Sequence, residues 1–135
     1  MAYKITEIES IGPATAEKLE KAGIKTVEGL LDKAHSRSGR KKVAEESGVS
    51  EGKILDFVNM GDMMRIKGIG GEFAELLKAS GVDTVKELRN RNAANLHEKM
   101  SAVNAEKKLT RRVPNAEQLQ NFIDLAKETE PMVTH

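Results

Sequence analysis

The stretch RIKGIGGEFAELL, at residues 65–77, contains a glycine-rich turn that could either bind a phosphate or simply join two helices. Glycine-rich turns that open a helix can cradle a phosphate, but a dinucleotide-binding turn needs three spaced glycines after a buried strand. Here Phe73 stands where the third glycine belongs, and the preceding NMGDMMRIK has no β-branched run. No Gly-Lys-Ser/Thr follows, so the phosphate loop of nucleoside triphosphatases does not fit either. The pattern therefore predicts a tight turn between two helices.

The same pattern occurs 58 residues earlier, as IESIGPATAEKLEKAGIKTVEGL at residues 8–30. Aligned with IKGIGGEFAELLKASGVDTVKEL at residues 66–88, it is identical at ten of 23 positions. Self-similarity on this scale indicates duplicated supersecondary units. The identical pairs are Ile8/Ile66, Ile11/Ile69, Gly12/Gly70, Ala16/Ala74, Glu17/Glu75, Leu19/Leu77, Gly23/Gly81, Thr26/Thr84, Val27/Val85 and Leu30/Leu88.

The repeated glycines mark where helices start and stop. Gly12 and Gly70 stand where a tight turn enters a helix, and Pro13 suits the first helical position because its missing N–H costs nothing there. Gly23 and Gly81 fall just past a helix, where a left-handed residue is favoured. We expect Gly23, Gly70 and Gly81 to have positive φ or to allow a close backbone approach.

The repeated threonines mark the next helix starts. Thr26 and Thr84 are predicted N-caps, and Glu87 is placed to complete a capping box with Thr84. Each copy therefore predicts a helix, a short turn and a second helix.

The duplication continues more faintly toward the end of the chain. VSEGKILDFVNMG at residues 49–61 is similar to VPNAEQLQNFIDLA at residues 113–126, and GRKKVAEES and ANLHEKMSAV predict a helix before each. The register changes from 58 to about 64–65, which places an insertion in NAEKKLTRR at residues 104–112. We predict an all-α protein of two units, residues 1–61 and 62–135. The predicted core is Leu19, Leu30, Ile54, Phe57, Leu77, Leu88, Leu119 and Phe122.

The segments IESIGPATAEKL and IKGIGGEFAELL resemble the helix-hairpin-helix motif, in which a hydrophobic-Gly-hydrophobic-Gly turn joins two helices. Nearly the whole chain is similar to a family of small bacterial proteins recorded as a domain of unknown function with helix-hairpin-helix character. The resemblance implies two tandem helix-hairpin-helix (SAM-like) units, and it raises binding of duplex DNA through the sugar-phosphate backbone. Ser10 departs from the motif, because a glycine is expected there.

In such hairpins, backbone amides at the start of the second helix would meet a phosphate. The candidates are Gly12, Ala14 and Thr15, with Lys18 one turn on, and Gly68, Gly70 and Gly71 in the second copy. Pro13 removes one donor from the first hairpin, and Glu72 and Glu75 would repel a phosphate at the second. The alternative is that both hairpins serve packing only.

Two clusters of basic residues could add phosphate contacts. The alternative is that both clusters are solvated loops and helix ends with no binding role. The clusters consist of Arg37, Arg40, Lys41 and Lys42, and of Lys107, Lys108, Arg111 and Arg112.

The remaining composition excludes more than it suggests. With 22 basic and 21 acidic residues, the net charge of +1 points to no particular partner. There is no cysteine, and His35, His97 and His135 have no metal-ligand spacing, so we predict no enzymatic activity, no cofactor and no metal site. The three Phe are predicted to be core residues and not stacking platforms.

The segment MAYKITEIES lacks the features of a signal peptide, and no apolar run reaches the ~18 residues of a membrane span. The sequence therefore predicts a cytoplasmic protein without a membrane partner. The rival function is a protein-interaction or assembly module that does not bind nucleic acid.

Overall fold

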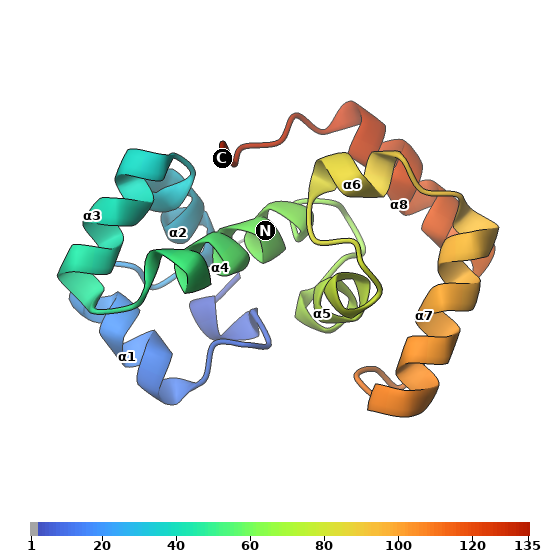
Figure 1. Ribbon diagram of the computed structural model, residues 1–135, viewed down its shortest axis with the longest axis horizontal. Helices are drawn as coiled ribbons and strands as arrows, with labels where there is room; N and C mark the ends of the chain where they lie inside the picture. Colours follow the sequence, from blue (N-terminus) through green and yellow to red (C-terminus); the bar gives the residue numbers. More distant parts are fainter. Residues whose placement is uncertain (1–2) are drawn as a thin grey trace. The chain divides into compact units, whose positions relative to one another are not determined.

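The computed structural model describes residues 3–135, and its regular structure is helical (Figure 1). Within that range lie eight α-helices and one short 3-10 helix, and the β-type pairing is limited to a single bridge between Lys4 and Thr26. The prediction of an all-α protein is confirmed. Contacts group the chain into two compact units, one reaching to Asp62 and including Met132–His135, the other comprising Met63–Pro131. The predicted boundary lies beside this division, but Met132–His135 belong with the first unit.

The first unit is built from short helices whose starts are capped by side chains. Thr26 accepts the amide of Gly29 at 3.0 Å, and Ser36 accepts the amide of Gly39 at 3.1 Å, so two orphan donors are satisfied. The third helix packs against both the first and the second. The helices of this unit are η1 (Ile5–Glu7), α1 (Pro13–Lys21), α2 (Val27–Ala34), α3 (Arg37–Ser47) and α4 (Glu51–Met63).

The second unit centres on its last helix. This helix begins in a capping box of Asn115 and Gln118, and it packs against the two helices before it. Arg89 donates to the carbonyl oxygen of Ala126 at 2.7 Å and also to that of Thr129, so it satisfies carbonyls at the C-terminal end of the last helix. The helices are α5 (Gly71–Ala79), α6 (Val85–Arg89), α7 (Ala93–Lys107) and α8 (Ala116–Glu128).

One predicted cap forms only in half. Thr84 accepts the amide of Glu87 at 3.0 Å, which confirms Thr84 as an N-cap. The carboxylate of Glu87 does not return to Thr84; it pairs with the guanidinium of Arg91 at 2.8 Å. Arg91 also donates to the carbonyl oxygen of Gly81, so it ties the end of α6 to the turn that precedes it. The predicted capping box is therefore wrong, because a charged partner one turn along competes for Glu87.

The two hairpin helices end in the same way. Gly23 has φ 81° and Gly81 has φ 93°, each one residue beyond the C-cap. The amides of Ile24 and Val82, just after these glycines, bond back to Leu19 and Leu77 at 3.0 and 2.8 Å. This is the Schellman arrangement, which satisfies carbonyls at a helix end and needs a left-handed residue. The predictions for Gly23 and Gly81 are confirmed.

The turns that precede these helices differ at one position. Both are closed by a hydrogen bond from the fourth residue to the first, Ile11 to Ile8 at 2.9 Å and Ile69 to Ile66 at 3.0 Å. In the second turn Gly68 has φ 97°, the sign that a type II turn requires at its third residue. The corresponding Ser10 is not among the described residues with positive φ. The two turns therefore close alike with different backbone conformations.

The prediction for Gly70 was wrong. Gly70 has φ −95° and ψ −171°, ordinary extended backbone, and a Cβ placed on it would meet nothing within 4 Å. It is the N-cap of α5, as Gly12 is of α1, and neither helix has a side-chain cap. The glycine that the second hairpin requires is Gly68.

The eight predicted core residues are all buried. Leu19, Leu30, Ile54, Leu77, Leu88 and Leu119 are fully inaccessible. Phe57 and Phe122 are buried as expected, whereas Phe73 is half-buried and stands with its ring centroid 6.4 Å from that of Phe122. The apolar periodicity of the sequence thus identified the inner faces of the helices.

Candidate nucleic-acid interface

The first hairpin presents unpaired amides at the start of α1. Gly12 and Ala14 are exposed, Thr15 is half-buried, and no side chain caps the helix. The first turn contains no acidic residue, and the exposed Lys18 follows one turn along. A helix start of this kind favours an anion, because its amides and dipole point toward it. Glu9, exposed in the turn itself, opposes that attraction.

The turn of the second hairpin packs against Phe122 of α8. A Cβ on Gly68 would lie 2.7 Å from Cε1 of Phe122, so this glycine admits the Phe122 ring of α8 against the turn. Gly70 and Gly71 are half-buried, and Glu72 is exposed in the first turn of α5. One carboxylate oxygen of Glu75 is buried with no hydrogen-bond partner. These features favour a structural role for the second turn over a phosphate site.

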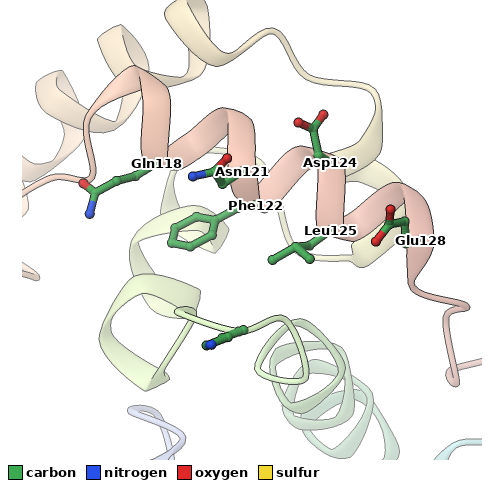
Figure 2. Close-up of a pocket in the computed structure, with 7 residues that line it drawn as sticks. Gln118, Asn121, Phe122, Asp124, Leu125 and Glu128 are labelled. Atoms are coloured by element: carbon green, nitrogen blue, oxygen red, sulfur yellow. The ribbon is translucent and has the colours of Figure 1, made fainter.

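An open pocket lies beside this turn. It is lined by Lys67 of the turn and by one face of α8, where the ring of Phe122 and the side chain of Leu125 point toward the turn (Figure 2). Asp124 and Glu128 add carboxylates on the same helix. The pocket has a volume of roughly 490 Å³ and its lining is mainly apolar. Its carboxylates make it a poor place for a phosphate.

Arg40 does not belong to a surface cluster, contrary to the sequence prediction. It is 4% exposed, and its guanidinium donates to the carbonyl oxygens of Ala34, His35 and Thr134 at 3.1, 2.8 and 2.6 Å. Burial lowers the pKa of Arg40, as does the nearby Arg37, while Glu51 acts in the opposite direction. The guanidinium still carries its charge at neutral pH, since arginine does not deprotonate in proteins. Its role is to satisfy carbonyls at the end of α2.

The rest of the first cluster stays on the surface. Arg37, Lys41 and Lys42 are exposed along α3, and the exposed Glu45 and Glu46 follow within one turn. Their carboxylates offset much of the positive charge that the three cations supply. This helix packs against α1, the helix of the first hairpin.

The second cluster, unlike the first, has all four of its cations on the surface. Lys107, Lys108, Arg111 and Arg112 are all exposed at the end of α7 and in the connection to α8. We call residues 107–112 the basic loop. No acidic residue occurs between Glu106 and Glu117. Because Arg40 of the first cluster is buried, the basic loop holds more exposed cations than any other six-residue segment of residues 3–135.

The basic loop is held in place by side chains of α7. The amide group of Asn104 makes two hydrogen bonds with the backbone of Thr110, donating to its carbonyl and accepting its N–H, both at 3.0 Å. Lys108 takes the left-handed conformation, with φ 52°, and ends α7. Two helical turns before Asn104, His97 bonds through Nδ1 to the carbonyl oxygen of Pro114 at 2.8 Å. The connection is thus fixed near both ends.

Sequence reasoning missed these two positioning residues. His97 was considered only as a possible metal ligand, and Asn104 was not singled out. The available signal was their spacing of seven residues, which places two hydrogen-bonding side chains on one face of a helix. Nothing local indicated that the partner of that face would be the following loop.

Most of the chain, including most of the residues described above, matches one protein family. A family model described as a domain of unknown function, DUF4332, matches residues 9–129. The chain belongs to the DUF4332 family. The DUF4332 match includes the second hairpin, the first hairpin except Ile8, and the basic loop, and it ends before Met132–His135. No curated protein and no solved structure matches the chain.

Two further features of this DUF4332 chain concern membranes and metals. In residues 3–135 no helix combines the length and the apolar character needed to cross a bilayer. Over the same range, no group of three or more His, Cys, Asp or Glu side chains is placed to hold a metal ion.

Proposed function

We propose that this protein is a non-catalytic, tandem helix-hairpin-helix protein that binds nucleic acid through the sugar-phosphate backbone, without reading sequence. Duplex DNA is the proposed partner. The observation that carries the proposal is the basic loop, with four exposed cations and no acidic residue between Glu106 and Glu117. Phosphate neutralisation by Lys and Arg supplies most of the affinity of non-specific binding. Binding of this kind is expected at roughly micromolar or weaker dissociation constants at physiological salt.

The position of the loop in the chain supports a role beyond packing. α7 has 15 residues where α3 has 11, and the connection after α7 is longer than that after α3. If the two units are duplicates, the added length is the segment at residues 104–112, which carries all four cations. The first unit closes without such a segment. Its charge is therefore not needed to build a unit of this type.

The hydrogen bonds of Asn104 support the same role. A loop that is already ordered loses less conformational entropy when it binds, so more of the electrostatic attraction appears as affinity. With Thr110 held on both its N–H and its carbonyl, the backbone between Lys108 and Arg111 is fixed. The flexible ends of the four side chains are left to adjust to the phosphates.

The hairpins contribute unequally in this proposal. The first offers the amides of Ala14 and Thr15 with Lys18 nearby, so it is the proposed second contact. The second is assigned to packing, because Phe122 covers its turn and Glu72 occupies its first helical turn. Arg37, Lys41 and Lys42 on α3 are the remaining exposed cations of the first unit to which the proposal assigns phosphate contacts.

The test is fluorescence anisotropy with a labelled duplex of about 20 base pairs at several salt concentrations. The affinity should fall steeply with salt, and Arg111→Ala with Arg112→Ala should flatten the log–log slope by about 1.8, the value for two lost phosphate contacts. Lys86→Ala with Lys127→Ala is the matched control. It removes the same charge from exposed positions on α6 and α8, and should change the slope much less.

Three results are informative. An equal effect of the two double variants would show that only net charge matters, which contradicts the assignment to the basic loop. Asn104→Ala keeps every charge, so weaker binding with an unchanged thermal stability would support the role of loop order. No binding of the unaltered protein at low salt would overturn the nucleic-acid proposal.

The rival function is a protein-interaction module, and the pocket beside the second turn is the observation in its favour. Phe122 and Leu125 give it an apolar floor, and Asp124 and Glu128 give it carboxylates. This combination suits a basic peptide with an apolar anchor better than it suits a phosphate. The anisotropy experiment separates the two functions, since a protein-interaction module predicts no salt-dependent affinity for DNA.

A further inference from the structure

The last four residues pack as an extended segment on the first unit. We call Met132–His135 the return segment, because it follows α8 of the second unit and belongs by its contacts to the first. It has no regular secondary structure. Its attachment is made by backbone groups, by the buried side chain of Val133, and by the hydroxyl of Thr134, which donates to the carbonyl oxygen of His35 at 3.4 Å. A groove holds an extended peptide mainly through such backbone contacts.

The end of α2 provides the first part of this attachment. The N–H of Thr134 donates to the carbonyl oxygen of His35 at 2.9 Å, and the carbonyl of Thr134 accepts from Nη2 of Arg40 at 2.6 Å. One residue of the segment is thus held on both its donor and its acceptor. Arg40 is buried, and the three acceptors of its guanidinium named above are all backbone carbonyls, so the segment supplies one of the partners that a buried guanidinium needs.

The end of α4 provides the second part. The N–H of Met132 donates to the carboxylate of Asp62, at 3.2 Å to one oxygen and 3.4 Å to the other. Asp62 is 3% exposed. Between these two anchor points, Val133 buries its side chain and is 8% exposed. The surface therefore recognises an N–H, then a small aliphatic side chain, then an N–H and a carbonyl in order.

We propose that the first unit carries a docking site for an extended peptide segment, that the return segment is its resident occupant, and that a partner protein presenting an extended segment with an aliphatic residue takes its place. Recognition runs mainly through the backbone of the peptide, so the main requirement on sequence is one aliphatic side chain at the Val133 position. A hydroxyl at the Thr134 position adds one long hydrogen bond. Arg40 and Asp62 are the residues that position the peptide. This proposal does not depend on nucleic-acid binding.

The features that hold the segment also make exchange feasible. A second segment with an aliphatic residue can reproduce all the backbone contacts and the buried contact, because no side chain of the resident other than Val133 is buried. Only the hydrogen bond from the Thr134 hydroxyl requires Ser or Thr at the next position. The incoming peptide has to compete with a segment that is covalently attached and so has a high effective concentration. Weakening the contacts of the return segment should therefore expose the site.

The test uses the full chain labelled with ¹⁵N and a synthetic peptide, EPMVTH, with the sequence of residues 130–135. Val133→Asp places a charge at a buried position and should release the segment, which moves the amide signals of His35, Arg40 and their neighbours. Adding the peptide should move these signals back toward their original positions. A peptide with Asp in place of valine should have no effect, and the unaltered chain should need much more peptide for any change.

Thr134→Pro is the second variant. It removes the N–H that donates to His35 without adding charge to the core, so it tests release if Val133→Asp disturbs the fold. Val103→Asp, at a half-buried position in α7, is the control substitution and should not move the signals of His35 and Arg40. If Val133→Asp and Thr134→Pro leave the amide signals of His35 and Arg40 in place, the proposal is wrong. It is also wrong if a large excess of peptide fails to restore the signals.

Discussion

Replacing Gly68 by alanine should destabilise the second unit more than its exposed position suggests. Gly68 has φ 97°, and placing a side-chain-bearing residue in left-handed backbone costs about 1–2 kcal/mol. The new Cβ would also lie 2.7 Å from Cε1 and 3.3 Å from Cζ of Phe122. Overpacking against a buried side chain costs about 1–3 kcal/mol. The free energy of unfolding should therefore fall by roughly 2–5 kcal/mol, the sum of these two ranges.

The control is alanine at Gly70, two residues along the same turn. Gly70 has φ −95°, and a Cβ there meets nothing within 4 Å. The change affects only the N-cap preference of α5, where glycine is better than alanine, so we expect a loss of about 1 kcal/mol or less. Urea unfolding followed by far-ultraviolet circular dichroism measures both variants, and the comparison needs no assumption about the rest of the chain.

A third variant separates the two parts of the cost. Phe122→Leu removes the ring that Gly68→Ala would strike, so in this background the alanine should cost less, with only the backbone part remaining. If Gly68→Ala costs no more than Gly70→Ala, the turn geometry and the role assigned to Phe122 are both refuted.

Two further predictions concern the core and a helix end. Leu77→Ala removes a fully buried side chain from α5 and should lower the free energy of unfolding by about 2–5 kcal/mol in urea denaturation; a loss below 1 kcal/mol would mean that the site is not a packed core position. Gly81→Val places a β-branched residue at φ 93° and should cost well over about 1 kcal/mol, measured in the same way, whereas a neutral effect would contradict the Schellman end of α5.

Local chemistry made much of the fold predictable. The hydrogen bonds that cap the helix ends close within six residues, so the local sequence contains both partners of each bond. The capping residues are Thr26, Thr84, Gly23 and Gly81. The buried positions, such as Leu77, follow from helical periodicity in the same local way. The capping box at Glu87 failed for a reason that is also local, because Arg91 competes for the same carboxylate.

The candidate site was less predictable, because its decisive partners are distant in sequence. Nothing near Gly68 indicates that Phe122 will cover it, and so the requirement for glycine was assigned to Gly70. Arg40 looks like one cation among four until Thr134 supplies its acceptor. The exposure of the basic loop could be anticipated from its composition, but its order could not, since that depends on where Asn104 and His97 point.

The first unit has a consequence for the way the protein is made. A ribosome completes Asp62 long before Met132–His135, yet those residues belong to the same unit. Until they emerge, Arg40 lacks an acceptor that lies 94 residues further along the chain, and Asp62 lacks the N–H of Met132. Domains made first usually fold first during synthesis. Here the N-terminal unit can collapse early but acquires its last hydrogen bonds only when translation of the second unit is finished.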